Sequence, residues 1–416
     1  MKKNLIRILF KQRLTLLMIF LSIFFSINTK AQISEKYLND VSSHLIKMDE
    51  TFNGRYPDYT IAGVYQYRDN VNWFSGFIAG ELWNLYDIKN NEDLKTRALK
   101  HADALLEYAG IDYTHDMGFI FMPSVVQAYK ETGLEKYKEA GITAARMLAK
   151  RYNTNGNFIK AWGALSDTSK SGWMIIDTML NLELLFWAWQ ETGEVEFYDI
   201  AYKHAITCMK ESVRKDFSSY HVIEFNPENG KVLKKRTHQG WKDETTWARG
   251  QAWGIYGFAN AYKFTGDERF LNTSKKMADV FIKALPKDYI PFWDLDLSGI
   301  NVVRDASAAA IASSGMYILS EETNFKNDYE KYFNYANLIA KSLIDKYTFL
   351  NSNREKEEGL LIHSVYNYHK NWGVDESYPA GDFYFTEVLK KYIEKNRKLT
   401  DSENEVRSKI LLNDNW

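Results

Sequence analysis

The chain has 416 residues, of which 45% are hydrophobic and 15% aromatic, so it can bury a large core as one big domain or two ordinary ones. Its charges nearly cancel, with 53 Lys and Arg against 54 Asp and Glu. No long-range field therefore points to nucleic acid or to a membrane surface, and an anionic ligand would have to be held by a few local groups.

The first 31 residues have the three-part form of a secretory signal. A basic start, MKKNLIRILFKQR, precedes the apolar run Leu14–Phe25 and small residues at Thr29 and Ala31. The apolar run is too short to span a bilayer. We expect residues 1–31 to be a signal peptide that is cut near Ala31, which sends the mature protein to the periplasm or out of the cell. An uncleaved anchor is the alternative.

Five segments repeat a pattern of helix, turn and second helix. Three of them place Thr-Gly between aromatic residues and begin at Ala128, Ala188 and Ala261, and two weaker copies without the glycine begin at Leu85 and Leu319. A glycine at this point suits the left-handed position that ends a helix, and the residues after it are apolar at spacings of three and four. Five such hairpins, with room for a sixth, predict an all-α domain of stacked hairpins.

The helices before these turns are apolar on nearly all sides, as in WARGQAWGIYGFANAY and RDASAAAIASSGMY. Helices of this kind lie inside a fold and are covered by a second layer. We therefore predict an (α/α)6 barrel, a double toroid of six helical hairpins, in preference to an open solenoid. No linker divides the chain, so residues 32–416 are expected to form a single domain.

Two aspartates stand out against these apolar segments. Asp116 follows His115 just before an apolar helix start, where it could cap the helix or carry chemistry. Asp177 lies in the apolar run MIIDTMLNLELLF, which we expect to be helical, with Asn181 one turn later. A carboxylate there is costly to bury unless it is paired. Asp177 is therefore either a hydrogen-bonded structural residue or an acid whose pKa is raised by desolvation and a second carboxylate.

Aromatic residues in polar or Gly-rich segments add to the candidate site. These are Trp73, Trp162, Trp241 and Trp253. Arg249 lies four residues before Trp253, so the two side chains would share one face of a helix. Aromatic faces, carboxyl groups and one Arg are what a pocket for an acidic sugar needs.

The only cysteine, Cys208, allows no intramolecular disulfide, and metal-binding Cys/His spacings are absent, so we expect no metal and no cofactor.

Six segments, in matching order from about Trp73 to Tyr384, resemble glycoside hydrolase family 88, the unsaturated glucuronyl hydrolases. They are THDMGFIF, MIIDTMLNLELLFWAWQETG, THQGWKDETTWARGQAWGIYGF, LPKDYIPFWD, RDASAAAIASSGMY and GDFYF. The resemblance implies an (α/α)6 barrel that removes a 4,5-unsaturated uronic acid from the non-reducing end of oligosaccharides made by polysaccharide lyases. It implies that Asp177 protonates C4 of the double bond and activates the water that adds at C5, with Asp116 as its partner.

The same resemblance assigns the substrate contacts. It implies that the sugar is contacted by His115, His221, Gln239 and Arg249, and that the aromatic walls on which the sugar stacks are Trp73, Trp162 and Trp253. On this hypothesis Arg249 grips the uronate, while Gly250 and Gly254 leave room for the ring.

Two alternative functions stay open at this point. One is the related family 105, unsaturated rhamnogalacturonyl hydrolases that act on pectin fragments, and the other is a non-catalytic, oligosaccharide-binding helical toroid. The expected partner is the unsaturated oligosaccharide, with no nucleic acid and, after signal cleavage, no membrane; we expect a monomer or a weak dimer. The source polysaccharide and its sulfation are not specified, although Ser364, Asn367, His369 and Lys370 could contact a sulfate.

Overall fold

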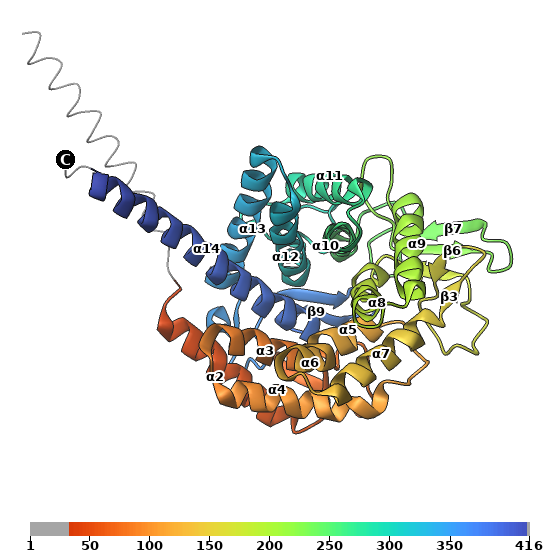
Figure 1. The fold of residues 1–416 in the computed structure, drawn as a ribbon, viewed down its shortest axis with the longest axis horizontal. Coiled ribbons are helices and arrows are strands. Elements are labelled where there is room, and N and C mark those ends of the chain that lie inside the picture. The colour runs from red at the N-terminus through yellow and green to blue at the C-terminus, as the bar shows by residue number, and fades with distance from the viewer. Residues whose placement is uncertain (1–32, 414–416) are drawn as a thin grey trace, which may run out of the picture. The chain divides into compact units, whose positions relative to one another are not determined.

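A closed ring of six apolar helical segments forms the centre of residues 42–413 in the computed structural model, which describes residues 33–413 (Figure 1). In chain order the ring consists of α3 (Phe77–Lys89), the continuous segment α5 (Met117–Phe121), η2 (Met122–Val126) and α6 (Gln127–Thr132), then α8 (Thr178–Thr192), α10 (Ala248–Thr265), α12 (Ala306–Glu322) and α14 (Pro379–Asn413). Each segment packs against the next, and α14 packs against α3, which closes the ring.

Amphipathic helices cover this ring from outside. They are α4 (Glu92–Leu105), α7 (Glu135–Ala149), α9 (Val195–Glu211), α11 (Glu268–Ala284) and α13 (Lys326–Lys346), and each packs on the inner helix that precedes it. The remaining helical elements are α2 (Glu35–Phe52), η1 (Leu106–Tyr108) and η3 (Phe349–Asn351). The predicted all-α barrel is therefore confirmed. The predicted signal peptide, residues 1–31, lies outside the described residues.

The turns between inner and outer helices follow the sequence repeat. Gly133, Gly193 and Gly266 end their helices at φ values of 67°, 74° and 67°, a conformation that costs glycine little. Asn90, at φ 51°, takes the same place in one of the copies without glycine. The last copy differs, because α12 ends at Thr323 in an extended conformation.

Short antiparallel hairpins are inserted between the barrel helices. They are β1 (Tyr56–Ile61) with β2 (Val64–Arg68), β3 (Tyr152–Asn153) with β4 (Phe158–Ile159), and β8 (Ser364–Asn367) with β9 (Trp372–Glu376); β5 (Trp173–Ile175), β6 (Val222–Phe225) and β7 (Val232–Arg236) form a three-stranded sheet in that order. The register of the sheet pairs Ile175 with Val222 and Val222 with Arg236. Residues just beyond these pairs, including Asp177 and His221, are thereby brought together.

None of the described helices is both long and apolar enough to cross a membrane.

Candidate active site

A cavity of about 230 Å³ lies where α5 and α8 begin, and its wall combines aromatic rings with two carboxyl groups. Its lining residues are Trp73, His115, Asp116, Phe119, Trp162, Ile175, Asp177, His238, Gln239, Tyr366, Asn367, Lys370 and Trp372. Six predicted site residues are among them, whereas His221, Arg249 and Trp253 lie behind the wall. A larger cavity of about 340 Å³, further along α3, α8, α10 and α14, contains no predicted site residue.

Asp177 stands at the junction between β5 and α8, at the N-cap position, and not within a helix as predicted. Its side chain makes no capping hydrogen bond, so the carboxyl group is free to face the cavity. The side chain is only 16% exposed, and Oδ2 has no hydrogen-bond partner among the described residues. A buried oxygen without a partner is costly, and a bound ligand or water would satisfy it.

The surroundings of Asp177 favour its protonated form. Burial raises the pKa of Asp177 to about 7, the charge of Arg249 opposes this rise, and the negative charge of Asp116 adds to it. Near neutral pH both protonation states of Asp177 are therefore populated. Such a group can donate a proton in one step and accept one in the next.

Asp116 occupies the N-cap position of α5, but its carboxylate does not cap the helix, so the capping alternative is wrong for its side chain. Oδ2 accepts a hydrogen bond from the Thr114 hydroxyl at 2.8 Å, and Oδ1 accepts one from the Asn181 amide at 3.5 Å. His115 Nε2 lies 3.3 Å from Oδ1. Asn181 Oδ1 in turn accepts the backbone N–H of Phe119 at 2.9 Å, which fixes α5 against α8. The Asp116 carboxylate is thus held at the cavity wall.

His221 lies outside the cavity lining and directs a ring N–H group toward the Asp177 carboxyl group. Its Nδ1 accepts the backbone N–H groups of His238 and Gln239, at 3.2 and 3.3 Å, so the proton of the neutral ring is on Nε2. Nε2 is 3.6 Å from Asp177 Oδ2. Burial lowers the pKa of His221 well below its usual value, and the charges of His238 and Arg249 lower it further. His221 is therefore a neutral donor that faces the catalytic candidate.

Arg249 does not reach the cavity, which corrects the predicted grip on a uronate. Its side chain is 1% exposed, and its guanidinium donates to the carbonyls of Val365 and Tyr366 in β8, with Asp305 Oδ2 at 3.4 Å as counter-ion. The guanidinium lies 4.4 Å from the centre of the Trp247 ring rather than over Trp253. Because its donors are engaged by β8, Arg249 acts on the site as a buried positive charge and a support for that strand.

The glycines after Arg249 also serve packing and not a sugar ring. A Cβ on Gly250 would come within 2.8 Å of the Trp247 ring, and one on Gly254 within 2.2 Å of the Met277 side chain. Trp253 is fully buried, with its ring 5.3 Å from Phe119, so it supports a cavity residue instead of forming a wall.

Sequence reasoning missed three aromatic lining residues, Phe119, Tyr366 and Trp372. Tyr366 and Trp372 lie on the β8–β9 hairpin, where their rings stack 6.0 Å apart. The alternating segment HSVYNYHKNWGVDE carries the signal of such a hairpin. A search confined to helical segments does not detect it.

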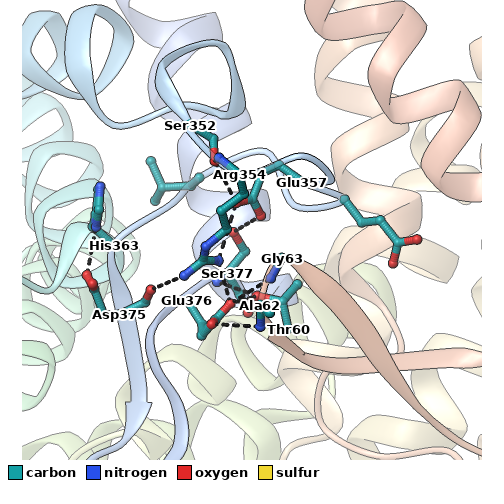
Figure 2. A network of polar contacts seen from close by, with 12 residues as sticks. Thr60, Ala62, Gly63, Ser352, Arg354, Glu357, His363, Asp375, Glu376 and Ser377 are labelled. Atoms are coloured by element: carbon teal, nitrogen blue, oxygen red, sulfur yellow. Dashed lines mark hydrogen bonds and ion pairs between the residues drawn. The ribbon is translucent and has the colours of Figure 1, made fainter.

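A network centred on Arg354 and Glu376 holds this hairpin against β1–β2. Figure 2 shows Arg354 between Glu357 and Glu376. Its Nη1 lies 3.3 Å from the Glu357 carboxylate and 2.7 Å from the Glu376 carboxylate. The Glu376 carboxylate also accepts the backbone N–H groups of Ala62 and Gly63, at 2.9 and 3.2 Å. Since these hydrogen bonds join the β1–β2 turn to the end of β9, the aromatic wall on β8–β9 is fixed at its base.

No group of three or more His, Cys, Asp or Glu side chains is placed to hold a metal ion among the residues that the structure describes. A barrel of paired helices with two carboxyl groups in an aromatic-walled cavity suits glycoside hydrolysis, which uses a pair of carboxyl groups.

Comparison with known proteins gives the same class. Residues 45–292 match the model of Glycosyl Hydrolase Family 88. An unsaturated chondroitin disaccharide hydrolase from Streptococcus pneumoniae is 37% identical over 80% of this chain and 85% of its own length. The crystal structure of an unsaturated glucuronyl hydrolase from Streptococcus agalactiae superposes with a TM-score of 0.81 at 34% identity, over 88% of this chain and 94% of that one. An unsaturated glucuronyl hydrolase specific for heparin superposes with a TM-score of 0.80 at 34% identity, over 88% and 99%. This chain belongs to Glycosyl Hydrolase Family 88.

Proposed function

We propose that the protein is an unsaturated glucuronyl hydrolase, which removes the 4,5-unsaturated uronic acid from the non-reducing end of oligosaccharides released by polysaccharide lyases. The observation that carries this proposal is the pair of carboxyl groups in one cavity, of which Asp177 has a pKa of about 7. The names of the relatives support it over the pectin-directed and the non-catalytic alternatives.

The proposed reaction begins at the double bond. Protonated Asp177 delivers its proton to C4, which leaves an oxocarbenium-like centre at C5. Ionised Asp177 then takes a proton from the water that adds at C5, while His221 Nε2–H, 3.6 Å from its Oδ2, stabilises the carboxylate. The resulting hemiketal rearranges and releases the remaining oligosaccharide.

Asp116 and the aromatic residues have supporting roles in this scheme. Asp116 raises the pKa of Asp177 and accepts hydrogen bonds from the sugar hydroxyls, together with its neighbour His115. Trp73 and Trp162 provide faces for the ring, and Gln239, held by a 2.8 Å bond from its amide to the Tyr366 carbonyl, offers its side-chain oxygen. Arg249 contributes positive charge from beneath the wall.

The mouth of the cavity favours an anionic aglycone of the glycosaminoglycan type. The pKa of His238, which lines the cavity, is lowered to about 4 by burial and then by the charges of Lys370, Arg236, His369 and Lys170. Lys370 lines the cavity and thus places a positive charge at this site, although the chain as a whole is nearly neutral. A panel of sulfated and unsulfated unsaturated disaccharides would identify the preferred aglycone.

The central experiment is replacement of Asp177 by Asn. We expect Asp177→Asn to keep its fold but to lose about a thousandfold in kcat/KM, equivalent to about 4 kcal/mol of barrier, measured as loss of the ultraviolet absorbance of the conjugated double bond. Asp199→Asn, on the exposed face of α9, is the matched control and should behave as the wild type. Activity of Asp177→Asn within threefold of the wild type would remove Asp177 from the mechanism.

We further propose that residues 1–31 are a cleavable export signal and that the mature protein, residues 32–416, is a single barrel domain in the periplasm or outside the cell, as a monomer or weak dimer. The basic, apolar and small-residue regions of this segment support export. Amino-terminal sequencing of the exported protein should give Gln32 as the first residue.

A further inference from the structure

The cavity is small for a ligand made of several sugars. Its volume of about 230 Å³ is below the roughly 300–1,000 Å³ of pockets that enclose a drug-sized ligand. It can hold the terminal uronic acid and the atoms next to it. On the proposed function, the rest of an oligosaccharide must therefore lie over the rim, and the rim residues decide which chain lengths bind well.

The turn between β8 and β9 carries an exposed aromatic ring at this rim. Tyr368 lies between Asn367 and Lys370, which both line the cavity, and its side chain is 44% exposed. One face of its ring is stacked on Trp293, with the ring centres 4.2 Å apart and the planes 8° from parallel. Trp293 itself is only 2% exposed. A buried indole thus supports Tyr368 from below, while the ring remains open to solvent.

A second exposed aromatic residue, Trp241, lies on a neighbouring loop, and one hydrogen bond connects that loop to the turn that carries Tyr368. His369, directly after Tyr368, donates from Nε2 to the carbonyl of Gly240 at 2.6 Å, and Gly240 directly precedes Trp241. Trp241 is 40% exposed, and its backbone N–H donates to Asp294 Oδ2 at 2.8 Å, next to Trp293. The chain therefore holds two exposed aromatic side chains on neighbouring, mutually fixed loops.

These features suit a ligand because the two exposed rings lie on neighbouring loops beside the cavity, and covering them would remove apolar surface from water. Both loops are held by hydrogen bonds, so binding would lose little additional conformational entropy. A pyranose ring has an apolar C–H face that stacks on an aromatic ring. Cations lie near these rings: Lys242 Nζ is 4.0 Å from the centre of the Trp241 ring, and Lys370 lines the adjacent cavity. Sugar stacking with adjacent anion contacts matches the surface better than an apolar partner does.

We propose that Tyr368 and Trp241 form an outer subsite that stacks sugar rings of the aglycone beyond the one next to the scissile bond, so that the enzyme selects unsaturated tetrasaccharides over disaccharides. This inference rests on the proposed function of the same site. It extends that function from the terminal residue to the length of the chain.

The test is the ratio of kcat/KM for the unsaturated tetrasaccharide to that for the unsaturated disaccharide, both prepared by lyase digestion of chondroitin. We expect this ratio to fall at least fivefold in Tyr368→Ala and in Trp241→Ala. Tyr368→Phe, which retains the stacking face, should keep the ratio within twofold of the wild type. Phe325→Ala removes an aromatic residue that is 71% exposed just before α13 and serves as the matched control.

The ratio separates this subsite from a general loss of structure. A variant that loses activity on both substrates by one factor leaves the ratio unchanged, and an unchanged ratio in both alanine variants would overturn the proposal. Absence of turnover of both the unsaturated disaccharide and the unsaturated tetrasaccharide by the wild type would instead refute the proposed function. The two failures are therefore distinguishable.

Discussion

The pKa of Asp177 makes a prediction about the pH dependence of catalysis. If the protonated carboxyl group starts the reaction, kcat/KM should fall on the basic side of pH 7, because burial raises the pKa of Asp177 to about 7. The protonated fraction drops about tenfold for each further pH unit, so kcat/KM at pH 9 should be about one hundredth of its plateau. The assay is the loss of absorbance of an unsaturated disaccharide at low substrate concentration from pH 5 to pH 9.

Two variants should shift the basic limb of the pH profile, the fall of kcat/KM above pH 7, in opposite directions. The negative charge of Asp116 raises the pKa of Asp177, so Asp116→Asn should shift the limb to lower pH even though its overall rate is also reduced. The positive charge of Arg249 lowers the same pKa, so Arg249→Met should shift the limb to higher pH. Limbs that coincide with the wild type in both variants, or that shift in one direction in both, would refute the assignment of Asp177 as the acid.

Two predictions concern stability. A rise in the pKa of Asp177 from 3.8 to about 7 means that ionising it in the folded state costs up to about 4 kcal/mol, so Asp177→Asn should unfold at higher denaturant concentration than the wild type at pH 8. This gain should shrink as the pH falls below 7 and nearly vanish near pH 3, where the folded and unfolded proteins both hold the proton. An equal gain at all pH values would contradict the prediction. Arg249→Lys should lower the free energy of unfolding by about 1.5–3 kcal/mol, because an ammonium group cannot bind the Val365 and Tyr366 carbonyls and Asp305 as the guanidinium does. Equilibrium unfolding in urea measures this loss, and a wild-type midpoint with an unchanged slope would show that the contacts are not stabilising.

The barrel could be predicted because its signals are local. The turns at Gly133, Gly193 and Gly266 need a left-handed residue, and a glycine or asparagine there is visible in the chain. The all-round apolar character of the inner helices likewise requires an outer layer, which α4, α7, α9, α11 and α13 provide. The resemblance to family 88, confirmed by the comparisons, rests on several segments of this kind in order.

The candidate site was predictable only in part. Asp116 and Asp177 stand out because a carboxyl group in an apolar segment is costly, and both line the cavity. The helical spacing placed Arg249 and Trp253 on one face of a helix but did not reveal what that face contacts, because periodicity shows which face a residue occupies and not which segment packs against it. The partner of Arg249 is β8, more than a hundred residues later in the chain.

The sequence by itself determined the helices, their turns, the inner and outer layers and the two aspartates, since each depends on neighbours within a few residues. The tertiary structure alone decided that Arg249 supports a strand instead of facing the cavity, that His221 turns its Nε2 toward Asp177, and that Tyr368 is backed by Trp293. The physical reason is that these side chains obtain their partners from segments far along the chain. Their direction and their protonation follow from burial and charge, which exist only once the barrel has closed.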